Sequence, residues 1–148
     1  MEQVMTSVST QKPPFQPQAA LATAADVMQP PLTTVNQHDH VAAAAYLMKH
    51  AGSTSLMVMD AQSGQPAGII TETDVAHAIA DGKDVNDLWV GAVMTSRPAV
   101  ITTTSIRDAA EMMTDRHFRH LPVGDDAGLL GVVDIIDVCR TLISSGEG

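Results

Sequence analysis

Two polar residues that follow a short apolar run are the best candidates for ligand chemistry in this chain. The run from Gly68 to Asp74 reads Gly-Ile-Ile-Thr-Glu-Thr-Asp. A strand that ends at Ile70, followed at once by a helix, would place Thr71 and Asp74 on the first helical turn. An ionised carboxylate can accept hydrogen bonds from both vicinal hydroxyls of a ribose, and the N–H groups of a helix N-terminus favour an anion. The segment therefore predicts a site for a sugar that carries an anionic group.

The same residues also match a purely structural pattern. Thr71 and Asp74 have the spacing of a capping box, in which each side chain accepts a hydrogen bond from the other residue's backbone N–H. Such caps start many helices. Taken alone, the pattern favours this structural interpretation. Its position after Gly-Ile-Ile, and its recurrence later in the chain, favour ligand contact.

The chain repeats itself. Three blocks recur in the same order, with offsets of 66, 65 and 63 residues. They pair 27–28 with 93–94, 41–48 with 106–113, and 68–75 with 131–138. Matched blocks in one order indicate an internal duplication.

The second copy departs from the first at the candidate site. Asp134 stands in the position of Thr71, and Asp137 in the position of Asp74. Two carboxylates on one turn would help to cap the helix but would repel a phosphate. We therefore expect two unequal sites, of which the Thr71 and Asp74 site binds the ligand better.

Each copy has the pattern of a small mixed α/β (α+β) unit. The expected elements are an extended piece (32–35; 99–101), a helix (39–50; 105–116), two strands (56–59 and 67–70; 121–123 and 129–133) and a second helix (72–81; 134–144). One such unit cannot bury its sheet face alone, whereas two units laid sheet to sheet can. A cleft with pseudo-two-fold symmetry is expected between them.

Several segments together resemble a known family. These segments are Asp26-Val27-Met28, Ala92-Val93-Met94, Arg119-His120-Leu121-Pro122-Val123 and the two Gly-containing blocks. The pattern resembles the CBS domain, named for cystathionine β-synthase, and the pair resembles a Bateman module. The expected organisation is a flexible arm at 1–23, a first domain at 24–82, a connector at 83–90 and a second domain at 91–144.

The resemblance implies a regulatory protein that binds an adenine nucleotide (AMP, ADP or ATP) as its ligand, with no other cofactor. S-adenosylmethionine and NAD are alternatives because both contain adenosine. The implied contacts are Thr71 and Asp74, with Asp134 and Asp137 in the second copy. The loop before the central strand implies that Arg119 and His120 meet phosphates, whereas Gly52 and Ser53 leave space. Val35 and Ile70 would sandwich the purine.

The resemblance also implies a homodimer formed through helices, with apolar faces around Met48, Met112 and Met113. An unidentified effector protein would respond to a ligand-induced change in the angle between the repeats. A ligand-free dimerisation scaffold is the main alternative, and Asp134 is its best support.

Composition excludes other classes of function. The formal net charge of −9 argues against nucleic-acid and anionic-membrane partners, and no run approaches a membrane span. The lack of a secretory signal and the single Cys139 indicate a cytoplasmic protein. The histidine pairs 38/40 and 117/120 lack the companions of a metal site. No nucleophile with an adjacent base and no P-loop is present, so we expect no enzyme, although an unrecognised catalytic site stays a third hypothesis.

Overall fold

A computed structural model of the chain describes residues 22–29 and 33–144. Module 1 consists of β1 (Thr34–Asn36), α3 (Val41–Ala51), β2 (Ser55–Met59), β3 (Pro66–Thr71) and α4 (Glu72–Ala80). Module 2 consists of β4 (Val100–Ile101), α5 (Ile106–Arg116), β5 (His120–Asp125), β6 (Gly128–Asp134) and α6 (Ile135–Ser144). Two short segments complete the fold, α2 (Ala24–Val27) and the 3-10 turn η1 (Val90–Ala92). The predicted arm lies outside the described residues except for its last two positions, as does Leu32 of the first extended piece.

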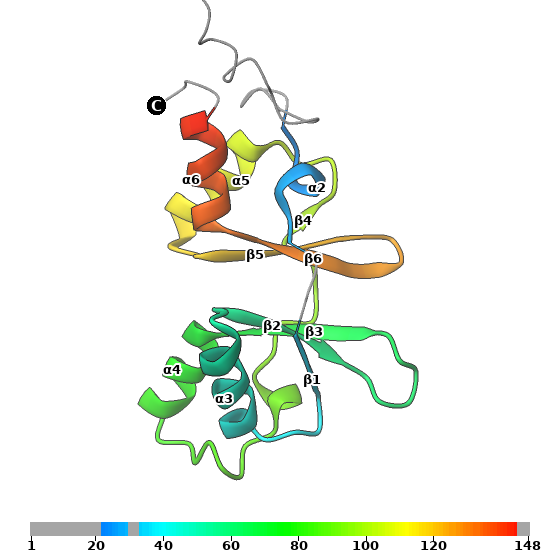
Figure 1. Cartoon of the computed structure of the whole chain (residues 1–148), viewed down its shortest axis with the longest axis vertical. Helices are drawn as coiled ribbons and strands as arrows, with labels where there is room; N and C mark the ends of the chain where they lie inside the picture. Colours follow the sequence, from blue (N-terminus) through cyan, green and yellow to red (C-terminus); the bar gives the residue numbers. More distant parts are fainter. Residues whose placement is uncertain (1–21, 30–32, 145–148) are drawn as a thin grey trace, which may run out of the picture.

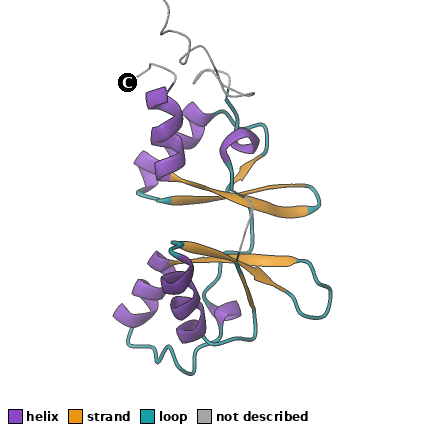
Figure 2. Cartoon of the chain, in the orientation of Figure 1, coloured by secondary structure: helices purple, strands orange, loops and turns teal. Residues whose placement is uncertain are grey.

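The two modules have the same sheet topology, as the duplication predicts. In each, the first strand pairs in parallel with the second, and the second pairs antiparallel with the third. The orders are β1-β2-β3 and β4-β5-β6. The two sheets face each other, and the helices cover their outer faces (Figures 1 and 2). The predicted sheet-to-sheet pair of α/β modules is confirmed.

Helical spacing explains how each module buries its core. Val41, Ala44 and Met48 lie on one face of α3 and pack against the outer face of the sheet. Ile106 and Met113 occupy matching positions on α5 in module 2. Met48 is 4% exposed and Met113 is 2% exposed. Met48 and Met113 therefore fill the cores of their modules, so a dimer face around Met48, Met112 and Met113 would have to use other side chains.

The inner faces of the two sheets make a second, smaller core. Side chains alternate between the faces of a strand. Accordingly, Ile70 of β3 points to the helices of its own module, whereas Ile69 packs with Met57 and with Leu129 of the other sheet. This inter-sheet cluster fixes the distance across which a ligand can contact both modules.

The segments that precede the modules are exchanged between them. The helix α2 packs on module 2, where the Ala24 N–H donates to the Thr104 carbonyl over 2.7 Å. In the opposite direction, Val90 of η1 is buried in module 1, and its N–H donates to the Asp39 carbonyl over 2.8 Å. A boundary drawn along the sequence therefore does not separate the two packing units. Across the described ranges 22–29 and 33–144, each helix is too short or too polar to span a bilayer.

Candidate functional site

The capping box that the sequence predicts at the start of α4 is present. The Thr71 N–H donates to Oδ2 of Asp74 over 2.9 Å, and the Asp74 N–H donates to Oγ1 of Thr71 over 3.2 Å. The cap takes only Oδ2, and a carboxylate offers about four lone-pair sites on its two oxygens. Asp74 can therefore cap its helix and still accept hydrogen bonds from a ligand.

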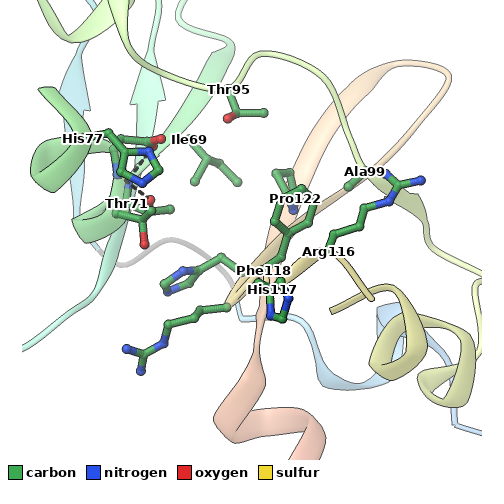
Figure 3. A pocket seen from close by; sticks show the side chains of 13 residues that line it. Ile69, Thr71, His77, Thr95, Ala99, Arg116, His117, Phe118 and Pro122 are labelled. Carbon is green, nitrogen blue, oxygen red and sulfur yellow. Dashed lines mark hydrogen bonds between the residues drawn. The ribbon is translucent and has the colours of Figure 1, made fainter. Parts of the chain in front are cut away.

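Both capping residues line a cavity between the modules. The cavity has a volume of about 540 Å³, which is within the range of small-molecule sites. Module 1 and the segment after it contribute Ile69, Thr71, Thr73, Asp74, His77, Thr95 and Ala99, and module 2 contributes the run 116–120 and Pro122. Figure 3 shows Ile69, Thr71 and His77 across the space from Phe118 and Pro122. The site is therefore shared between two segments far apart in sequence.

Burial sets the electrostatics of the module 1 wall. It raises the pKa of the Asp74 carboxyl above its usual value. Hydrogen bonds with Thr71 and the charges of His77 and His120 offset this only in part. The carboxylate thus lacks part of the solvation that it would have in water, and donors supplied by a ligand would restore it.

The opposite wall is basic in an otherwise acidic protein. The helix α5 ends at His117, which adopts the left-handed conformation with φ of 59°. Arg116, the last residue of α5, lines the cavity together with Phe118, Arg119 and His120, which follow the cap. Guanidinium groups suit phosphate oxygens because they donate in a planar fork. The cavity consequently has a carboxylate on one wall and two arginines on the other.

Four of the residues proposed from the sequence meet at this cavity, namely Thr71, Asp74, Arg119 and His120. Val35 and Ile70 do not line it, because they belong to the core on the helix-covered face of the module 1 sheet. Neither side chain is therefore placed to contact a purine bound in this cavity. Strand alternation explains this placement, because the neighbouring Ile69 points inward instead.

The second predicted site is built differently. Oδ2 of Asp134 lies 3.2 Å from Nε2 of His120 and 3.2 Å from Oγ1 of Thr54, and Thr54 Oγ1 lies 2.7 Å from the same nitrogen. Oδ1 of Asp137 lies 3.5 Å from Nη1 of Arg140, and Oδ2 of Asp137 accepts a long hydrogen bond of 3.4 Å from the Asp134 N–H. Burial raises the pKa of the Asp137 carboxyl. These carboxylates bind side chains of the protein and do not line the cavity.

Gly52 and Ser53 lie outside the cavity as well. Gly52 ends α3 in the left-handed conformation, with φ of 65°, and Ser53 Oγ donates to the Ser55 carbonyl over 2.6 Å. The structure thus uses both residues to end a helix. Cavity residues that the sequence reasoning missed include Ile69, Thr95 and Pro122. Only the period-two alternation of β3 could have indicated Ile69.

Comparison with known proteins places the chain among CBS-domain proteins. The family model described as "CBS domain" matches residues 24–81 and 90–144. CBS domain-containing protein CBSX3, mitochondrial, of Arabidopsis thaliana is 34% identical over 101 residues, which are 66% of this chain and 49% of that protein. The chain thus spans about half the length of this relative.

The match between this chain and solved structures of the same fold extends over almost the whole of those structures. A putative signal-transduction protein with CBS domains from Burkholderia ambifaria MC40-6 has a TM-score of 0.69 at 30% identity, over 83% of this chain and 95% of that one. A crystal structure of CBSX2 in complex with AMP has a TM-score of 0.64 at 27% identity, over 82% and 96%. The tandem arrangement found here is therefore shared with known structures.

Proposed function

Because this chain belongs to the CBS domain family and contains two tandem copies, we propose that it is a regulatory protein that binds one adenine nucleotide between its modules. The observation that carries the proposal is the shared cavity, in which Asp74 of module 1 faces Arg119 and His120 of module 2. The similarity to CBSX2, whose structure is described in complex with AMP, supports this ligand class.

The lining of the cavity fits the three parts of a nucleotide. Asp74 and Thr71 offer acceptors for ribose hydroxyls. Arg116 and Arg119 offer donors to phosphate oxygens. The apolar surfaces of Ile69, Phe118 and Pro122 suit the faces of a purine. S-adenosylmethionine and NAD share the adenosine part and are the alternative ligands.

A ligand in this position would act as a conformational effector. Because it would contact both modules, it would favour the inter-module angle at which both sets of contacts form. The size of the response is limited by the difference in ligand affinity between the two arrangements. An effector protein would bind the surface that this inter-module angle forms. This role requires no catalysis.

A ligand-free scaffold is the second candidate. It is favoured by the internal bonds of Asp134, which already uses Thr54 and His120 as partners. Under that function the capping bonds of Asp74 would be its whole role.

Thermal melting with nucleotides separates the two candidates. A ligand at 100 times its dissociation constant stabilises the folded state by about 2.7 kcal/mol. For a chain of this size we expect the melting temperature to rise by roughly 5–10 °C. AMP, ADP, ATP, S-adenosylmethionine and NAD form the test panel, with GMP as the control for the base. Unchanged melting with every adenosine compound at millimolar concentration would support the scaffold.

We also propose that the chain forms a homodimer through its helices and works in the cytoplasm. Large apolar side chains are exposed on three helices, namely Tyr46 (60%) on α3, Ile79 (59%) on α4, and Ile136 (52%) and Ile143 (70%) on α6. A closed two-fold dimer would cover such surface. Light scattering should give twice the mass of the chain, and replacing Ile79 and Ile143 together with Asp should give the mass of one chain. A monomeric unmodified protein would refute the dimer.

A further inference from the structure

One residue connects the cavity to a polar cluster between the modules. His120 lines the cavity, yet its Nε2 atom contacts Thr54 Oγ1 at 2.7 Å and Asp134 Oδ2 at 3.2 Å. Thr54 belongs to module 1, and the other two residues belong to module 2. The hydroxyl of Thr54 also donates to the Asp134 carboxylate over 3.2 Å. We call these three residues the inter-module cluster.

Sheet register explains why the cluster forms. His120 is the first residue of β5, and Asp134, the last of β6, is its direct partner in the antiparallel ladder. Directly opposite side chains on one face lie close enough to interact. Asp134 occupies the position that Thr71 has in module 1, so a carboxylate reaches the imidazole here.

The contacts of the cluster favour one tautomer of His120. An ionised carboxylate only accepts hydrogen bonds, and the single hydroxyl hydrogen of Thr54 is donated to Asp134, so both contacts of Nε2 favour a hydrogen on that nitrogen. In the neutral ring Nδ1 then carries the lone pair. Among the described residues, no hydrogen bond to Nδ1 is formed. Protonation of the ring would therefore place a new N–H donor at Nδ1.

The surroundings of His120 act on its protonation in opposite directions, so the charge of a bound ligand can change its protonation state. The side chain is 7% exposed, and burial lowers the pKa of the imidazole. Asp134 acts in the opposite direction, Arg119 adds to the lowering, and Glu72 and Asp74 favour the charged ring. A phosphate in the cavity would add negative charge beside the ring and favour the imidazolium.

We propose that Asp134 and Thr54 position His120 to recognise the phosphate of the bound nucleotide, so that the site selects phosphorylated over unphosphorylated adenosine and takes up one proton on binding. The proton comes from solvent and resides on Nδ1, while Nε2–H keeps its bond to Asp134. This inference rests on the proposed function, and it assigns Asp134 a positioning role instead of simple repulsion of phosphate.

Histidine titration by NMR tests the proton uptake. The signal of His120 is assigned by its loss in the His120→Gln variant. Saturation with AMP is expected to raise its titration midpoint by about one pH unit or more, which corresponds to about a tenfold stronger interaction with the charged ring. Adenosine is expected to leave the midpoint unchanged. AMP binding with an unchanged midpoint would overturn the inference alone, whereas the absence of binding by every adenosine compound of the melting panel would overturn the proposed function as well.

Calorimetry on Asp134→Asn tests the positioning role. We expect the affinity for AMP to fall about tenfold and the affinity for adenosine to stay the same, because only the phosphate contact loses support. Asp126→Asn, in the exposed turn between β5 and β6, removes the same charge and should change neither affinity. Thr54→Val should weaken AMP binding roughly two- to tenfold, as expected for one lost hydrogen bond.

Two results would contradict the positioning role. Tighter AMP binding by Asp134→Asn would show that Asp134 acts mainly by repelling phosphate. Equal losses for AMP and adenosine, in variants that melt at the temperature of the unmodified protein, would show that the cluster supports the cavity in general and does not recognise phosphate.

Discussion

Replacing Asp74 with asparagine is expected to weaken AMP binding by roughly ten- to a hundredfold while leaving the fold nearly as stable. The expected loss corresponds to about 1.5–3 kcal/mol for hydrogen bonds to a charged group. Asparagine keeps an oxygen that can accept from the Thr71 N–H, so the cap survives. Calorimetry measures the affinity, and thermal melting measures the stability.

The chain contains a matched control for this variant. Asp26 caps α2 in a similar way, because the Thr23 N–H donates to its Oδ2 over 2.9 Å and the Thr23 hydroxyl donates to the same oxygen over 3.2 Å. Asp26→Asn makes the same substitution at the same position of a helix N-terminus but lies outside the cavity. It should leave AMP affinity unchanged. Equal binding losses in both variants, or in neither, would show that Asp74 serves only as a cap.

The raised pKa of Asp74 should give stability and binding opposite dependences on pH. Because burial raises its folded pKa above the unfolded value, the stability from this group is present at acid pH and is lost as pH rises through the folded pKa. Ribose binding needs the ionised carboxylate, so affinity should fall as pH drops through the same value. The Asp74→Asn variant should lack both dependences.

Gly68→Val is expected to lower the stability of the protein by about 1–3 kcal/mol, or roughly 2–12 °C in melting temperature. A Cβ atom at Gly68 would lie 2.7 Å from Sδ of Met94 and 2.8 Å from the carbonyl oxygen of Thr95. Methionine can move, but the Thr95 backbone is held by paired bonds with Ile69 of 2.8 and 2.9 Å. Nucleotide binding should weaken too, since Thr95 lines the cavity.

The control for this variant lies on the same hairpin. Ala61→Val adds apolar volume in the exposed turn between β2 and β3, and such surface changes stay within about 0.5 kcal/mol. Gly131→Val should repeat the effect in module 2, where a Cβ would lie 2.9 Å from the Gln29 carbonyl oxygen. Unchanged melting of both glycine variants would mean that the connecting segments are free to shift.

Local patterns predicted the elements well because they depend on near neighbours. The helix expected at 105–116 is α5 at Ile106–Arg116, and the helix expected at 72–81 is α4 at Glu72–Ala80. The duplication predicted the shared topology of both modules. The Thr71 and Asp74 pair was placed correctly at the start of α4, since capping chemistry is local.

Other features depend on contacts between distant residues, which one sequence does not reveal. Ile70 was expected in the site and Ile69 was not, because a short apolar run does not show which of its faces is inward. The exchange of α2 and η1 between modules follows from tertiary packing alone. Thr54 and His120 are 66 residues apart, so their contact could not be derived from spacing.

A crystal structure of the chain grown with saturating AMP tests the central claim most directly. The account predicts ribose hydroxyls within hydrogen-bond distance of Asp74, with the phosphate beside Arg119 and His120. A cavity that stays empty at saturation, or a nucleotide bound beside Asp137 instead, would contradict it.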